Sequence, residues 1–167
     1  MSAPFPYNAV AGVANDPAES EAENLLAQYS WLARWSDEMN KDVDLDYKKL
    51  AQFAFHCYKF RVWYDALQAR ITAGTHTPAQ IGDCLEGVFR KRKMGWGNRA
   101  AMNSDLQDIY AAAGVVYDWI KTNMQEARNF TTAQFDANFI NQTDVPVKVV
   151  KPAALATRIA QFRGLFS

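Results

Sequence analysis

The 167-residue chain is poor in the side chains from which metal and nucleophilic sites are usually built. It holds two cysteines, Cys57 and Cys84, and two histidines, His56 and His76. Two cysteines are too few to crosslink a chain of this length, which favours a reducing compartment. His56 and Cys57 are neighbours on a helical pattern and point about 100° apart, and His76 has no ligand at metal spacing beside it. The sequence therefore predicts no metal, no cofactor and no catalytic site.

Long hydrophobic runs are missing too. No segment approaches the roughly 20 apolar residues that span a bilayer. The N-terminus, MSAPFPYNAV, lacks the basic start and continuous apolar stretch of a secretory signal. Alternating carboxylates from Asp42 onward suggest a calcium loop, but Tyr47 and Phe53 stand where such a loop needs Gly and Glu. We expect an intracellular chain that makes no membrane contact.

Enough apolar material is present for a core, since 49% of the residues are hydrophobic and 13% are aromatic. A chain of this length buries roughly 68–70% of the surface that its unfolded form exposes. Residues 1–16 are rich in Pro, Ala and Gly and show no helical period. They predict an extended N-terminal arm that ends at a helix start, Asp16-Pro17.

Four segments show the spacing of amphipathic helices. They cover residues 17–39, 46–72, 78–93 and about 103–127. The acidic stretch NKDVDLD links the first two, Asp46 and Thr77 are suited to cap helices, and Gly95 and Gly97 fit a C-terminal stop. The second segment is apolar nearly all round, which is typical of the centre of a bundle or of a subunit interface. The predicted fold class is mainly α, with a four-helix bundle-like core over residues 17–128.

Two tryptophans lie off the apolar stripe of the first helix. Trp31 and Trp35 share an i, i+4 face of their own. This spacing predicts that the helix buries a second side against a neighbour.

The pattern changes after residue 128. Residues 129–151 contain β-branched and aromatic residues, a turn-prone NQTD and alternation around Pro146, which predict a short β-hairpin or extended arm. Pro152 then opens a short C-terminal helix within residues 152–167, which ends at Gly164.

Charge is distributed unevenly although the formal net charge is zero. Residues 1–46 hold nine acidic residues against Arg34 and Lys41, whereas residues 47–103 hold ten Lys and Arg against three acids. Such asymmetry is informative about contacts. The candidate acidic inter-subunit face on the first helix consists of Glu19, Glu21, Glu23, Asp37 and Glu38.

The third helix ends in four consecutive cations, which are Arg90, Lys91, Arg92 and Lys93. Cations at a helix C-terminus are each worth about 0.3–1 kcal/mol. Successive residues fan out around the helix axis, so the four cations cannot all lie near the last backbone carbonyls. A partner of opposite sign would account for the other cations. Nucleic-acid phosphate is one candidate, supported by Arg99 and by Trp96, which is able to stack on bases. The acidic first helix of an adjacent copy is another, and a solvated face is a third; neutrality and a pI of about 6.7 favour protein over nucleic acid.

The last third carries a family resemblance. LQDIYAAAGVVYDWIKTN leads through an extended stretch into VKVVKPAALATRIAQFRGLF. This order of long helix, extended arm and short terminal helix, together with the helical core and the acidic-to-basic polarity, resembles the small head-to-tail adaptor or neck proteins of tailed bacteriophages.

The resemblance implies a non-enzymatic structural subunit of a virion, made in the host cytoplasm. It would form a homo-oligomeric connector ring between the portal and tail components, through charge and arm contacts between neighbours and with non-specific DNA contact in the channel. The alternative is a small cytoplasmic helical binding or regulatory protein that uses its basic loop, residues 90–93, to engage nucleic acid or an acidic protein.

Overall fold

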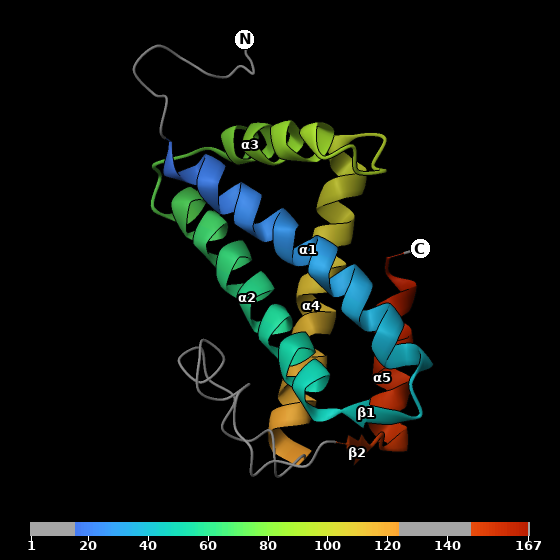
Figure 1. Cartoon of the computed structure of the whole chain (residues 1–167). Coiled ribbons are helices and arrows are strands. Elements are labelled where there is room, and N and C mark those ends of the chain that lie inside the picture. Colours follow the sequence, from blue (N-terminus) through green and yellow to red (C-terminus); the bar gives the residue numbers. More distant parts are fainter. Residues whose placement is uncertain (1–15, 124–147, 167) are drawn as a thin grey trace. The chain divides into compact units, whose positions relative to one another are not determined.

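A computed structural model describes residues 16–123 and 148–166. Its elements are α1 (Pro17–Lys41), β1 (Asp44–Asp46), α2 (Tyr47–Thr72), α3 (Pro78–Lys91), α4 (Arg99–Asn123), β2 (Lys148–Val150) and α5 (Ala153–Gly164) (Figure 1). The fold is mainly helical with bundle-like packing and a short C-terminal helix, which confirms the predicted class. Most of the predicted N-terminal arm and of the β-like arm lies outside the described residues.

The predicted helix starts are set by local caps. Asp16 Oδ1 accepts a hydrogen bond from the Ala18 N–H at 2.9 Å, and Asp46 Oδ1 accepts one from the Lys49 N–H at 3.1 Å. Thr77 forms a reciprocal capping box with Gln80, and Pro78 occupies the first turn. These side chains satisfy backbone donors that a helix leaves unpaired at its start.

Helix α4 begins earlier than its apolar spacing predicts. It starts at Arg99 rather than near residue 103, and Asn98 is its cap, with Oδ1 accepting a hydrogen bond from the Ala101 N–H at 2.8 Å. The first turn holds only Met102 as a buried apolar side chain, so periodicity alone does not reveal it.

The described chain divides into two compact units. Unit 1 comprises residues 16–27 and 62–104, and unit 2 comprises residues 28–61, 105–123 and 148–166. The core of unit 1 includes Leu25, Leu26, Leu67, Ile81, Leu85, Val88, Phe89 and Met102. The core of unit 2 includes Leu32, Met39, Leu50, Phe53, Phe60, Leu106, Ile109, Ile120, Leu155, Ile159 and Phe162. Every helix therefore places an apolar stripe in at least one core.

A two-stranded antiparallel sheet joins distant parts of unit 2. Strand β2 pairs with β1 in the register Asp44↔Val150, Leu45↔Val149 and Asp46↔Lys148. The partner of β2 thus lies in the acidic stretch for which the sequence predicted only a linker. Leu45, the middle residue of β1, is fully buried.

Helix α5 is fixed in unit 2 by ring contacts and by a lysine. The Phe162 ring packs edge-on against Phe53 with centroids 5.8 Å apart, and Phe166 lies 5.0 Å from Tyr29. Just before the helix, Lys151 Nζ donates to the Met39 carbonyl oxygen at 2.8 Å, near the end of α1. Aromatic packing and satisfaction of a helix terminus hold the C-terminal segment in place.

Both cysteines are free and buried, as expected of ordinary core thiols. Burial raises the pKa of Cys57 well above its usual range and that of Cys84 to about 12, so neither is a thiolate near neutral pH. Among the described residues, no helix is long and apolar enough to cross a membrane.

Candidate partner-contact surface

The end of helix α3 has an unusual residue at its turn. The backbone is left-handed at Lys93, with φ of 57°. The Met94 N–H donates to the Phe89 carbonyl at 2.9 Å, and the Lys93 N–H donates to the Arg90 carbonyl at 3.1 Å. This is the Schellman pattern. Its C-cap is Arg92, and the next residue, here Lys93, is usually glycine.

The predicted stop at Gly95 and Gly97 is therefore wrong. The turn comes at Lys93, and the only glycine with positive φ in the part of the chain that the structure describes is Gly74. A left-handed conformation costs a residue with a Cβ about 1–2 kcal/mol. Lysine occupies a backbone conformation that favours glycine, which suggests that its charged side chain is needed at this position.

Arg90 and Arg99, two of the predicted contact residues, both bind the Glu86 carboxylate inside unit 1. Arg99 Nη2 donates to Glu86 Oε1 at 2.8 Å and to Asp83 Oδ1 at 2.6 Å. Arg90 donates through Nε and Nη2 to Glu86 Oε2, at 3.1 and 2.9 Å. The Arg99 and Arg90 guanidinium groups hold the pKa of Glu86 below its usual range. Arg99 also lies against Gly82, where a Cβ would come within 2.8 Å of Nη1.

The next two cations face α1 of the same unit at longer range. Lys91 Nζ lies 3.8 Å and Arg92 Nε 3.9 Å from Glu23 Oε1, too far for hydrogen bonds. Glu23 Oε1 is buried and has no hydrogen-bond partner among the described residues. Part of the acidic-to-basic attraction predicted between copies thus acts within the chain, and Lys91 stays 72% exposed.

Lys93 and Trp96 complete the surface. Lys93 is exposed and makes no ion pair within the described ranges. Trp96 is half-buried, and its ring stands edge-on to Phe89 with centroids 5.5 Å apart. This contact anchors the loop that follows Lys93 to helix α3.

Each residue of the predicted acidic face has a cation in its own unit. The ion pairs are Glu21 with Arg70, Glu23 with Lys91 and Arg92, Asp37 with Lys41 and Arg163, and Glu38 with Arg34 and Lys49. Burial raises the pKa of Glu19, and the charge of Lys91 opposes this shift without a direct ion pair between these two described residues. Sequence spacing carried a signal for some of them, because Arg34–Glu38 and Asp37–Lys41 stand at i, i+4. The role of this face between subunits stays a prediction.

His76 connects the loop before α3 to Asp16 at the start of α1. His76 Nε2 lies 3.1 Å from both Asp16 carboxylate oxygens, and His76 Nδ1 lies 3.0 Å from Thr75 Oγ1. Asp16 Oδ1 also caps α1 through Ala18. The arrangement therefore ties two helix starts together. No group of three or more His, Cys, Asp or Glu is placed to hold a metal within residues 16–123 and 148–166.

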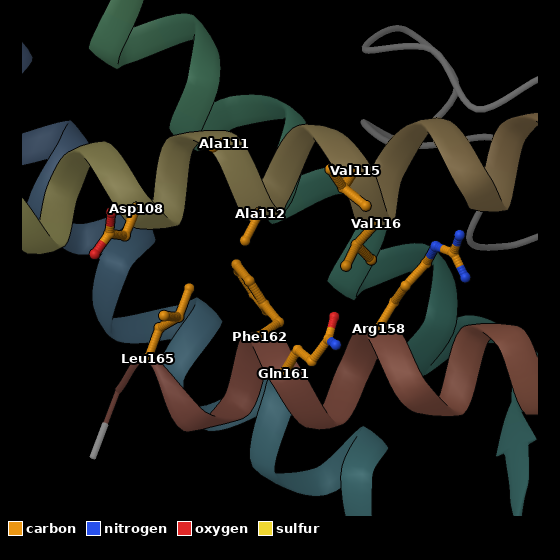
Figure 2. Close-up of a pocket in the computed structure, with 9 residues that line it drawn as sticks. All are labelled: Asp108, Ala111, Ala112, Val115, Val116, Arg158, Gln161, Phe162 and Leu165. Atoms are coloured by element: carbon orange, nitrogen blue, oxygen red, sulfur yellow. The ribbon is translucent and has the colours of Figure 1, made fainter.

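A shallow groove of about 390 Å³ lies between α4 and α5 in unit 2 (Figure 2). Ala112 and Val116 form its α4 side, and Phe162 points toward Ala112 from α5. Asp108 and Arg158 flank the apolar part. With few polar groups converging, the groove offers room but no chemistry for a small ligand.

Comparison with protein-family models, curated protein sequences and solved structures found no match to this chain. The structure gathers Lys91, Arg92, Lys93 and Trp96 at the exposed end of α3 and engages Arg90 and Arg99 internally. We call Lys91, Arg92, Lys93 and Trp96 together the basic end of α3.

Proposed function

We propose that this chain is a structural subunit of a tailed-phage virion, a head-to-tail connector protein of the adaptor or neck type. It assembles as a homo-oligomeric ring and contacts the portal and tail components, with no catalytic role. The resemblance of the last third supports this proposal. The order of α4, then β2 paired back to β1, then α5 packed on α2 is compatible with it.

The observation that carries the assembly role is Lys93. Its left-handed backbone is unfavourable for lysine, and its ammonium has no ion-pair partner within the described residues. Together with Lys91 and Arg92 it presents a basic end to a neighbouring subunit or to DNA in a channel. Heterologous contacts of this kind close a ring when the rotation between copies is constant, and complementary charge sets their register.

Two single substitutions in the basic run test this role. Lys93→Gln removes a cation that is free to meet a partner, whereas Arg90→Gln removes one that pairs with Glu86. We expect Lys93→Gln to fold normally and to lower incorporation into particles several-fold. Arg90→Gln serves as the matched control and should incorporate normally. Equal incorporation of both variants would remove the basic end from the assembly contacts.

The alternative function is a small cytoplasmic binding or regulatory protein that engages nucleic acid. Trp96 beside a run of cations favours it, because stacking and phosphate contact act together on single strands. If the isolated chain binds arbitrary DNA through Lys91, Arg92 and Lys93, the logarithm of its affinity should fall with that of salt with a slope of roughly −2 to −3. A salt-independent or undetectable interaction would dismiss this alternative.

A further inference from the structure

Unit 2 has a second groove, of about 440 Å³, between α1 and α2. It is lined by Trp31, Trp35, Lys49, Gln52 and His56. The two indoles are one helical turn apart on α1, and the three polar residues follow one face of α2. The groove is therefore walled by aromatic rings on one side and by hydrogen-bonding side chains on the other.

The aromatic wall is held in place. Trp31 is 42% exposed, and its ring stacks on His56 at 5.5 Å between centroids and 8° between planes. His56 Nδ1 lies 2.5 Å from Gln28 Oε1, and burial lowers the pKa of His56 to about 4. The imidazole is neutral near pH 7, so an uncharged, fixed aromatic surface faces solvent.

Trp35 adds an unsatisfied donor. Its indole Nε1 is covered by protein and has no hydrogen-bond partner among the described residues. Buried indole N–H groups usually find an acceptor. A small rotation of the ring toward the groove would offer this donor to a carbonyl of a bound chain.

We propose that this groove receives residues 3–7, Ala-Pro-Phe-Pro-Tyr, of a neighbouring copy; the inference rests on the proposed ring function. Pro4 and Pro6 fix φ near −65°, remove two N–H groups and restrict the residues before them, which favours polyproline II. That conformation leaves its carbonyls free of internal hydrogen bonds, and aromatic-lined grooves bind such segments.

Spacing, charge and length agree with this occupant. Polyproline II has three residues per turn, so Pro4 and Tyr7 share one face and can both meet the indole wall. Residues 1–15 contain no Asp, Glu, Lys or Arg, which suits a neutral wall. Residues 8–15 would connect the docked segment to the start of α1, and at about 3.1 Å per residue they reach roughly 25 Å, a distance that can bridge adjoining subunits.

Photo-crosslinking of the full chain tests the docking directly. Phe5 is replaced by benzoyl-phenylalanine, and equal amounts of nitrogen-14 and nitrogen-15 protein are mixed at the highest soluble concentration and irradiated. We expect crosslinked peptides that join residue 5 to the segments containing Trp31, Trp35 or residues 49–56, with one light and one heavy member. Crosslinks within a single isotope only, crosslinks elsewhere, or none would overturn the proposal.

A matched pair of variants separates the groove from general apolar contact. Trp31→Ser should lower the yield of mixed-isotope crosslinks roughly tenfold or more, as expected for a central aromatic contact. Val115→Ser, which also removes an exposed apolar side chain, should leave the yield unchanged. Equal yields in both variants would reject the groove. Docking concerns the purified chain, so its failure is distinct from absence of the chain from virions.

Discussion

Lys93 combines a left-handed backbone conformation with a charge that we propose contacts a partner. The Schellman turn after α3 needs a left-handed residue, and glycine adopts that conformation without steric cost. Lysine stands there instead, and its side chain extends the basic end of α3 by one charge. We interpret the residue as a compromise in which some stability is given up for a contact.

Replacing Lys93 with glycine should therefore stabilise the fold. We expect Lys93→Gly to raise the free energy of unfolding by about 1 kcal/mol because it relieves the left-handed strain. Urea denaturation measures this change. Lys91→Gly, in the last helical turn, is the matched control and should destabilise by up to about 1 kcal/mol. A loss of stability in Lys93→Gly would contradict the interpretation of strain.

The helical glycine Gly114 lies beneath the Arg61 side chain, which crosses over it. A Cβ on Gly114 would lie 2.8 Å from Arg61 Cζ, and the Arg61 guanidinium sits 4.3 Å from the centre of the Tyr110 ring. Gly114→Ala should be less favourable than Gly164→Ala, because the added methyl displaces the end of the Arg61 side chain from Tyr110. Loss of this cation–π contact, about 0.5–2 kcal/mol, offsets the gain of about 1 kcal/mol in helix propensity. Gly164→Ala, which meets nothing within 4 Å, should be neutral or stabilising. Thermal unfolding of the two variants decides the point, and equal stability would refute it.

His56 should make unit 2 sensitive to acid. Its folded pKa of about 4 lies below the ordinary value of 6.5, so the unfolded chain binds the proton more readily. Stability from this group is complete above pH 6.5 and falls by up to about 3 kcal/mol as pH drops to 4. Denaturant unfolding at pH 7 and pH 4.5 should show a smaller pH-dependent loss in His56→Gln than in the parent. An identical loss would exclude His56 as a cause.

At the scale of helices and strands, short-range patterns predicted most of the fold. Asp46 and Thr77 act within three residues of themselves, so their caps were readable from sequence. The start of α4 was missed because Asn98 caps a first turn with little apolar content. The pairing of β1 with β2 was missed because it joins segments about a hundred residues apart, and no local signal encodes that register.

The middle residue of β1 is a buried apolar side chain on which the short sheet depends. Leu45 is fully buried in β1, whereas Val150 in β2 is 76% exposed. Leu45→Ala should lower the free energy of unfolding by about 2–5 kcal/mol, and Val150→Ala by less than about 0.5 kcal/mol. Denaturation by guanidinium compares the two variants. A small effect of Leu45→Ala would mean that β1 contributes little to unit 2.

Across the described chain, many acidic and basic residues form ion pairs within their own compact unit. Glu21 pairs with Arg70 in unit 1, and Asp37 pairs with Arg163 in unit 2. The sequence revealed the asymmetry but not how much of it is satisfied internally, because most of these pairs join distant segments. The surfaces that we propose for partners are therefore fewer than the composition predicted: the basic end of α3 and the groove lined by Trp31 and Trp35.

The most direct test of the central claim is quantitative mass spectrometry of gradient-purified phage particles from the source. The chain should be present in a fixed ratio near the copy number of the portal protein, as expected of a connector ring. A large excess over the portal would indicate a shell or tube component instead. Absence from the particles would contradict the virion role.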